Sequence, residues 1–216
     1  MRRAVLLLLL AILSSSARAA VVPAVCADVV VAEAFARRAH ADQRYGELAF
    51  SEHLAYVHRI LRAFGFDDSN PRDSSIFVTA WLHDVLEDTT VSRDAIVAVF
   101  GEAIARSVDV LTLTSSQSRR EALLGSLDRM QDDEVALVVK LADRIANVDV
   151  CRTAFLRTGG SLCYTTYVAE WRYLREPFCR LAGRGRANAL WRYLDSLHGS
   201  EQVALPTAAG CIELKR

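Results

Sequence analysis

The part of this sequence best suited to chemistry is the run Trp81–Asp88, where a histidine and three carboxylates follow apolar residues. His83 and Glu87 are four positions apart, as are Asp84 and Asp88, so on an α-helix all four side chains would share one face. Like charges at this spacing repel, and carboxylates are almost never buried unpaired. The run therefore requires a positive partner, and a divalent metal ion is the first candidate.

Three further polar residues lie on helical faces that are otherwise apolar. His53 is placed at the start of an amphipathic segment, Asp143 interrupts the apolar run 135–142, and Asn147 follows Asp143 by one helical turn. Imidazole and carboxylate ligands suit manganese, iron, zinc or magnesium, and a mixed nitrogen and oxygen site favours manganese or another first-row metal.

Each of these residues also has an ordinary structural explanation. A single buried histidine is more often hydrogen-bonded than metal-bound, and Asp143 could simply pair with Lys140 or Arg144. The combination is harder to explain by packing, because desolvating four carboxylates without compensation costs about several kcal/mol each. The sequence therefore predicts one metal-containing site built from His53, His83, Asp84, Glu87, Asp88 and Asp143.

The elements that must position these groups are helices. Helical punctuation dominates the chain, and no two-residue alternation typical of strands persists. The pattern predicts an all-α single domain. We expect its helices over about 27–42, from a Ser51 cap to Gly65, through the acidic run, and over 92–101, 102–112, 118–131, 133–149, 161–182 and 186–198.

The first 19 residues have the pattern of a secretory signal peptide. Two arginines follow Met1, residues 4–13 are apolar, and Ala17-Arg18-Ala19 matches a small-x-small cleavage signal. The apolar run is about half of the ~20 residues that span a bilayer, so we expect no stable membrane span. The alternatives are an uncleaved hydrophobic tail or a misassigned start. We predict an exported protein, periplasmic or secreted, or a cytoplasmic one if the leader assignment is wrong.

The 216 residues suffice for one domain with a real core. We place this domain at 26–198 and expect the tail 199–216 to be loosely ordered. The chain has equal numbers of basic and acidic residues, and removing residues 1–19 takes away three arginines and no acidic residue, which leaves a formal charge of −3. Such a charge gives no general attraction for nucleic acid or acidic membranes, so we expect a small-molecule partner and no nucleic acid.

Five cysteines lie beyond the leader, and none has the CxxC spacing of a zinc site. In an oxidising compartment one or two disulfides are expected, and the odd count leaves at least one thiol over. The pairing stays open among Cys26, Cys151, Cys163, Cys179 and Cys211.

The order His53, then His83-Asp84, then Asp143 resembles the metal-binding order of the HD-domain phosphohydrolases. More narrowly, the chain resembles the RelA/SpoT-type guanosine 3′,5′-bis(diphosphate) (ppGpp) 3′-pyrophosphohydrolases, particularly their small single-domain forms. The resemblance covers roughly residues 27–198. The matching segments are 39–46 (AHADQRYG), 81–89 (WLHDVLEDT) and 139–147 (VKLADRIAN).

The resemblance implies a single HD-domain helical bundle with one metal centre. It implies that Glu87 and Asp88 orient or deprotonate the attacking water. It also implies that one divalent ion, usually Mn²⁺, is held by His53, His83, Asp84 and Asp143.

Substrate contacts are implied in the same way. Arg44 is expected to pack against the base, and Asn147 to line the nucleotide pocket. Tyr167, in the helix expected to close this pocket, is a further candidate contact. The chain departs from the family at Tyr45, where a lysine is frequent, and at 148–150, where a basic and a hydroxyl side chain are replaced by Val-Asp-Val.

These observations predict a metal-dependent hydrolase that cleaves the 3′-diphosphate of ppGpp and releases pyrophosphate. Because the frequent lysine and threonine are absent, a phosphohydrolase acting on another nucleotide, such as a nucleoside phosphate or the 2′-phosphate of NADPH, is a second hypothesis. A non-catalytic nucleotide-binding module is a third, and the presence of Glu87 and Asp88 argues against it.

Overall fold

The computed structural model describes residues 24–113, 118–183 and 185–198. The expected leader and tail lie outside these residues. Within them the chain is almost entirely helical, which confirms the predicted all-α class. The helices are α1 (Ala24–His40), α2 (Phe50–Ala63), α3 (Ser74–Leu82), α4 (Val85–Asp88), α5 (Arg93–Leu111), α6 (Arg119–Arg129), α7 (Glu134–Thr158), α8 (Leu162–Ala182) and α9 (Ala187–Leu197).

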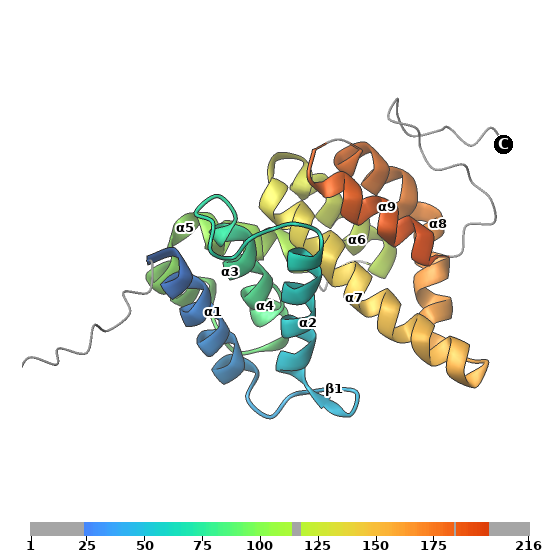
Figure 1. Cartoon of the computed structure of the whole chain (residues 1–216), viewed down its shortest axis with the longest axis horizontal. Coiled ribbons are helices and arrows are strands. Elements are labelled where there is room, and N and C mark those ends of the chain that lie inside the picture. The colour runs from blue at the N-terminus through green and yellow to red at the C-terminus, as the bar shows by residue number, and fades with distance from the viewer. Residues whose placement is uncertain (1–23, 114–117, 184, 199–216) are drawn as a thin grey trace, which may run out of the picture.

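The long helix α7 forms the centre of the bundle and contacts α2, α3, α5, α8 and α9 (Figure 1). The Asp133 carboxylate caps its first turn by accepting a hydrogen bond from Ala136 N at 2.9 Å. The predicted end near residue 149 is wrong, because no glycine or proline interrupts the helix before Gly159, whose φ of 75° ends it. This length lets one helix carry both a buried core face and polar side chains of a pocket.

The acidic run does not form the single helix that we expected. Helix α3, which is buried from Ile76 to Leu82, ends just before His83, and the short helix α4 begins just after Asp84. The two residues between them form a turn. Apolar periodicity in a fully buried helix does not mark its end, which explains why the sequence pattern missed this break.

Two helix starts test the capping predictions. Ser92 caps α5 by accepting from Ala95 N, and the expected boundary at Gly101 appears as a kink within α5, where φ is 83°. The predicted Ser51 cap is wrong, because α2 begins at Phe50 and Ser51 therefore lies inside the helix. Ser51 Oγ instead accepts a hydrogen bond from Arg37 Nη1 at 2.9 Å.

A small β-hairpin leads from α1 into α2 and was not predicted. Strand β1 (Arg44–Tyr45) pairs antiparallel with β2 (Leu48–Ala49), and Gly46 in the connecting turn has a φ of 62°. Strands of two residues are too short to show alternation, so no sequence pattern could reveal them. The hairpin places Tyr45 at the edge of the pocket described below.

Cys151 on α7 and Cys163 on α8 form a disulfide with a Cα–Cα distance of 5.7 Å. The bridge joins the end of the central helix to the start of the helix that follows it.

Among the described helices, none combines the length and the apolar character needed to cross a membrane.

Candidate active site

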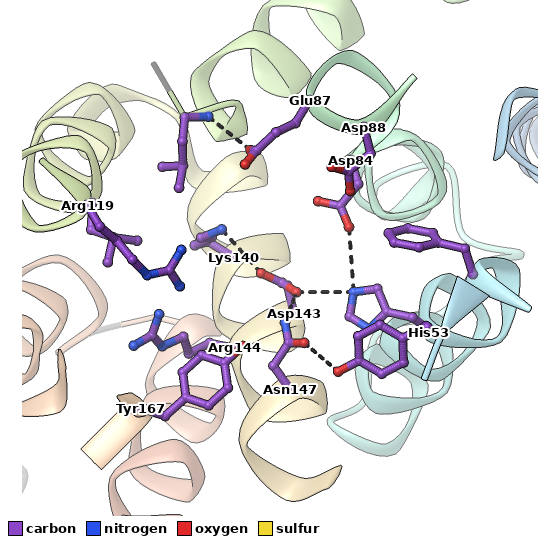
Figure 2. A pocket seen from close by; sticks show the side chains of 14 residues that line it. His53, Asp84, Glu87, Asp88, Arg119, Lys140, Asp143, Arg144, Asn147 and Tyr167 are labelled. Carbon is purple, nitrogen blue, oxygen red and sulfur yellow. Dashed lines mark hydrogen bonds and ion pairs between the residues drawn. The ribbon is translucent and has the colours of Figure 1, made fainter. Parts of the chain in front are cut away.

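A pocket opens beside the middle of α7 and contains about 670 Å³ of space, including the part that opens to solvent. Side chains from β1, α2, α4, α6, α7 and α8 line it. Figure 2 shows that its two sides differ in charge. Acidic groups gather near His53 and α4, whereas three cationic side chains, from Arg119, Lys140 and Arg144, lie on the other side.

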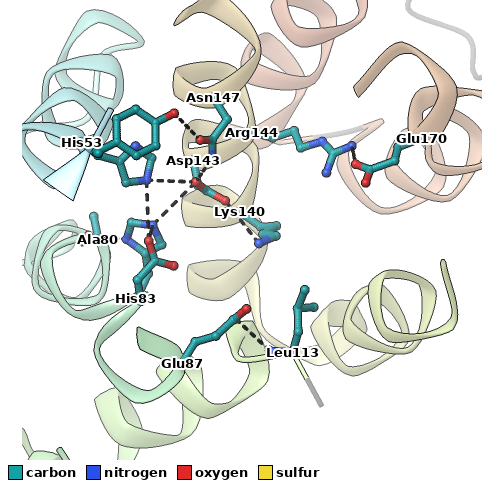
Figure 3. A network of polar contacts seen from close by, with 12 residues as sticks. His53, Ala80, His83, Glu87, Leu113, Lys140, Asp143, Arg144, Asn147 and Glu170 are labelled. Atoms are coloured by element: carbon teal, nitrogen blue, oxygen red, sulfur yellow. Dashed lines mark hydrogen bonds and ion pairs between the residues drawn. The ribbon is translucent and has the colours of Figure 1, made fainter. Parts of the chain in front are cut away.

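Two buried histidines face two carboxylates at the inner side of this pocket (Figure 3). His53 Nε2 lies 3.7 Å from Asp84 Oδ2 and 3.3 Å from Asp143 Oδ1. His83 Nε2 lies 3.1 Å and 3.6 Å from the same two oxygens. The structure thus brings together His53, His83, Asp84 and Asp143, which come from α2, the α3–α4 turn and α7.

His83 shows that this cluster suits a cation. Its Nδ1 donates a hydrogen bond to the carbonyl oxygen of Ala80 at 2.8 Å, so in the neutral ring Nε2 carries the lone pair. That nitrogen is buried and has no hydrogen-bond partner among the described residues, although Asp84 Oδ2 is its neighbour. A lone pair that faces carboxylate oxygens needs a positive charge between them. The donor set therefore fits a divalent metal ion.

The electrostatics of the cluster agree with this conclusion. Burial lowers the pKa of His83, but the Asp84 and Asp143 carboxylates oppose it and hold that pKa well above its usual value. Burial alone would raise the pKa of Asp143. Lys140 and the two histidines outweigh this effect and hold the pKa of Asp143 well below its usual value. Carboxylates that stay ionised in a buried cluster attract a cation.

Asp143 is held from both sides. Lys140 Nζ donates to its Oδ2 at 3.2 Å, which is one of the pairings that the sequence left open, while Oδ1 faces the histidines. Asn147 Nδ2 donates to the same Oδ1 at 2.6 Å, and the Tyr45 hydroxyl donates to Asn147 Oδ1 at 2.6 Å. The aspartate is therefore oriented by residues of α7 and of the hairpin.

Glu87 and Asp88 line the same pocket, outside the histidine cluster. Leu113 N donates to Glu87 Oε2 at 3.0 Å, which fixes the orientation of this carboxylate (Figure 3). Burial raises the pKa of Glu87, and burial together with the nearby Asp84 carboxylate raises that of Asp88. A raised pKa makes a carboxylate a better proton acceptor, which suits a general base.

The cationic side of the pocket was missed by the sequence analysis. Arg144, which is 3% exposed, and Arg119 both donate to the buried Glu170 carboxylate, and the Arg144 guanidinium lies 4.8 Å from the Tyr167 ring centroid. Arg144 directly follows Asp143 within the segment 139–147, which matches the family, so its position in the sequence could have revealed it. Arg119 stands in an exposed, polar helix start and gave none.

The predicted substrate contacts are placed differently from one another. Asn147 and Tyr167 both line the pocket. Arg44 does not line it; its exposed side chain donates to the carbonyl oxygen of Glu47 in the hairpin. The neighbouring Tyr45 lines the pocket instead.

Comparison with known proteins finds relatives that are named as hydrolases of a nucleotide. No family model matches the chain. A probable guanosine-3′,5′-bis(diphosphate) 3′-pyrophosphohydrolase from Mycoplasma pneumoniae is 27% identical over 139 residues, which is 58% of this chain and 18% of the relative. A protein of the same description from Synechocystis sp. is 34% identical over 123 residues, covering 53% of this chain and 15% of the relative. The chain thus spans less than a fifth of the length of these relatives.

A solved structure matches over most of both chains. It belongs to a metazoan ortholog of SpoT, described as hydrolysing ppGpp, and aligns with a TM-score of 0.62 and 22% identity over 79% of this chain and 93% of the other. At this identity the likeness shows the fold. Together with the sequence relatives, it confirms that the chain resembles the HD-domain hydrolases of the RelA/SpoT type.

Proposed function

We propose that the protein is a metal-dependent phosphohydrolase that cleaves the 3′-diphosphate of ppGpp and releases pyrophosphate. One observation carries this proposal: the Nε2 atoms of His53 and His83 lie 3.1–3.7 Å from carboxylate oxygens of Asp84 and Asp143. Of these, His53, His83 and Asp84 offer ligand atoms that all lie within 4.8 Å of one another. The relatives named for this reaction support the choice of substrate over other nucleotides.

The four converging side chains would hold the ion, with Mn²⁺ as the proposed metal. Two imidazole nitrogens and two carboxylate oxygens are a donor set that first-row divalent ions accept. A divalent ion bound here would lower the pKa of a water molecule toward neutrality and offset charge on the phosphoryl group. The Ala80 carbonyl fixes the His83 tautomer, and Asn147 and Lys140 fix the Asp143 carboxylate, so the ligands are oriented in advance.

Glu87 and Asp88 would handle water and protons. In the proposed step the water oxygen bonds to the phosphorus next to the 3′-oxygen, and the bond from this phosphorus to the 3′-oxygen breaks. The proton lost by the water would pass to one carboxylate, and the leaving 3′-oxygen would take a proton from the other carboxyl group, which must be protonated beforehand. Burial raises the pKa of both residues, which makes each a better proton acceptor.

The cationic side would bind the phosphates of the substrate. Lys140 lies next to the ligand Asp143, so it is placed to neutralise the diphosphate that is cleaved. Arg119 and Arg144 both pair with Glu170 and line the same pocket, which suits the binding of a second phosphate group. Tyr167 and Asn147 remain our candidates for contacts with the nucleoside, and Arg44 for a contact with the base.

We also propose that the protein is exported. The leader-like residues 1–19 support this, and so does the Cys151–Cys163 disulfide, because disulfides persist mainly in oxidising compartments. Mass spectrometry of the N-terminus of protein expressed in a bacterial host tests this proposal. A start at Ala20 is expected, and an intact Met1 in the purified protein would contradict it.

A nucleotide panel tests the reaction. The purified protein with Mn²⁺ is incubated with ppGpp, NADPH and nucleoside monophosphates, and released pyrophosphate is measured separately from released phosphate. We expect GDP and pyrophosphate from ppGpp, with loss of turnover after treatment with EDTA. Release of phosphate from the other nucleotides while ppGpp stays intact would overturn the substrate assignment but not the metal site.

A further inference from the structure

Tyr45 contacts the candidate metal centre in two ways. Its ring stacks on the His53 imidazole, with 4.8 Å between ring centroids and 23° between ring planes. Its hydroxyl donates to Asn147 Oδ1 at 2.6 Å, and Asn147 Nδ2 donates to Asp143 Oδ1 at 2.6 Å. Tyr45 therefore contacts one proposed ligand directly and reaches a second through a single residue.

The direction of these hydrogen bonds is informative. A side-chain amide has one acceptor oxygen and one donor NH₂ group, and a half-turn of the amide exchanges their positions. Because the Tyr45 hydroxyl donates to the amide oxygen of Asn147, the NH₂ group is left facing the Asp143 carboxylate. After this half-turn, the Asn147 amide oxygen would face the Asp143 carboxylate oxygen, and both are acceptors. The acceptor-only Asp143 carboxylate therefore sets the orientation of the amide, and the Tyr45 hydroxyl, by donating to the amide oxygen, holds the amide in that orientation.

Tyr45 is itself well fixed. It lies in β1, paired with Leu48, and its ring meets the Phe50 ring edge to face at 6.3 Å. The hairpin therefore presents a donor to α7 and a flat ring to α2.

We propose that Tyr45 is a positioning residue of the metal centre, which sets His53 by stacking and Asp143 through Asn147. This inference rests on the proposed function, because it takes His53 and Asp143 as metal ligands. It adds a role for a residue at which the chain departs from the lysine frequent in the family that it resembles. The hairpin becomes part of the metal site.

Metal affinity measured without substrate tests this role. Free Mn²⁺ is followed by electron paramagnetic resonance while it is titrated with wild-type protein, Y45F, N147A and the double variant. Y45F keeps the ring and loses the donor, so we expect about tenfold weaker Mn²⁺ binding, in the range found for other outer-shell partners. The double variant should bind no more weakly than N147A alone, since Tyr45 loses its route to Asp143 in either case.

Tyr193→Phe is the matched control. Tyr193 lies on α9 against Phe64, at the far end of α2 from His53, and its hydroxyl loss should leave Mn²⁺ affinity unchanged. Circular dichroism in EDTA checks that Y45F is folded, and N147A interrupts the same route by a second change. Wild-type Mn²⁺ affinity in Y45F would overturn the inference about Tyr45. So would a loss of Mn²⁺ affinity in the double variant equal to the sum of the two single losses. Either result would leave the proposed hydrolysis of ppGpp standing. Absence of Mn²⁺ binding to the wild-type protein would overturn the proposed function as well.

Discussion

His53 and Asp143 lie 3.3 Å apart, from Nε2 to Oδ1, on the packed helices α2 and α7. Both side chains are buried, at 3% and 8% exposure. A histidine and an aspartate this far apart in the sequence meet only because the bundle closes around them. The contact joins the two halves of the site, since His53 also faces Asp84 beside the acidic run.

Asp88→Asn should abolish most turnover without emptying the metal site. The amide cannot take a proton from water, and general acid–base groups contribute about 10²–10⁴-fold to rates. We expect kcat for ppGpp to fall by about that factor while Mn²⁺ affinity stays within about threefold of wild type. Asp128→Asn, an exposed change on α6, is the control. Unchanged kcat in D88N would remove Asp88 from the mechanism.

Glu170→Gln should destabilise the fold. Glu170 is 4% exposed and pairs with the buried Arg144, so its loss leaves a buried cation without its counter-charge. Breaking such pairs costs about 3–5 kcal/mol, and we expect the free energy of unfolding in urea to fall by at least about 2 kcal/mol because Gln keeps some hydrogen bonding. Glu176→Gln removes an exposed pair with Arg180 in the same helix and should cost less than about 1 kcal/mol. Equal losses in the two variants would contradict this assignment.

The disulfide should stabilise the link between α7 and α8. Cys151 and Cys163 are separated by 12 positions, and closing a loop of this size stabilises a protein by about 2–3 kcal/mol. Replacing both cysteines by alanine should lower the unfolding free energy by that amount, measured by urea denaturation without reductant. A loss below about 0.5 kcal/mol would show that the bridge adds little to stability.

Stability should decrease as the solution is acidified, because of His198. This side chain stacks on Trp171 at 4.6 Å, and burial, aided by Arg144 and opposed by Asp195 and Glu170, lowers its pKa to about 4. The unfolded chain, with a pKa near the usual ~6.5, binds the proton more readily. The contribution is therefore complete above about pH 6.5 and is lost as pH falls toward about 4, amounting to at most about 3 kcal/mol.

His198→Phe keeps an aromatic ring against Trp171 and removes the titrating group. The unfolding free energies of wild type and variant are compared between pH 4 and 8 in EDTA. We expect the variant to lose less stability than wild type on acidification. Parallel curves would show that His198 is protonated equally in the folded and unfolded states.

Much of the site was predictable from residue type and spacing, and the remainder depended on tertiary contacts. Carboxylates within apolar segments, such as Asp84 and Asp143, stand out because burial of charge is costly. Arg119 and Tyr45 gave no such signal, since Arg119 lies in the exposed first turn of α6 and Tyr45 in a two-residue strand. Their roles arise from partners distant in the sequence, Glu170 and Asn147.

The fold shows the same division. Glycines such as Gly101 and Gly159 act through their own backbone conformation, so a glycine can mark a helix end or a kink in the sequence. The turn at His83 and Asp84 contains neither glycine nor proline, so no residue type marks the end of α3, which packs against α1 and α7. The break matters, because it allows both residues to face His53 while Glu87 and Asp88 line the mouth of the pocket.

The most direct test of the central claim is anomalous X-ray diffraction from crystals grown with Mn²⁺, recorded at the manganese absorption edge. We predict one strong anomalous peak within about 2.0–2.4 Å of His53 Nε2, His83 Nε2 and oxygens of Asp84 and Asp143, in the range of first-row metal–ligand bonds. A map with no peak among these four side chains, at saturating Mn²⁺, would contradict the metal-dependent mechanism.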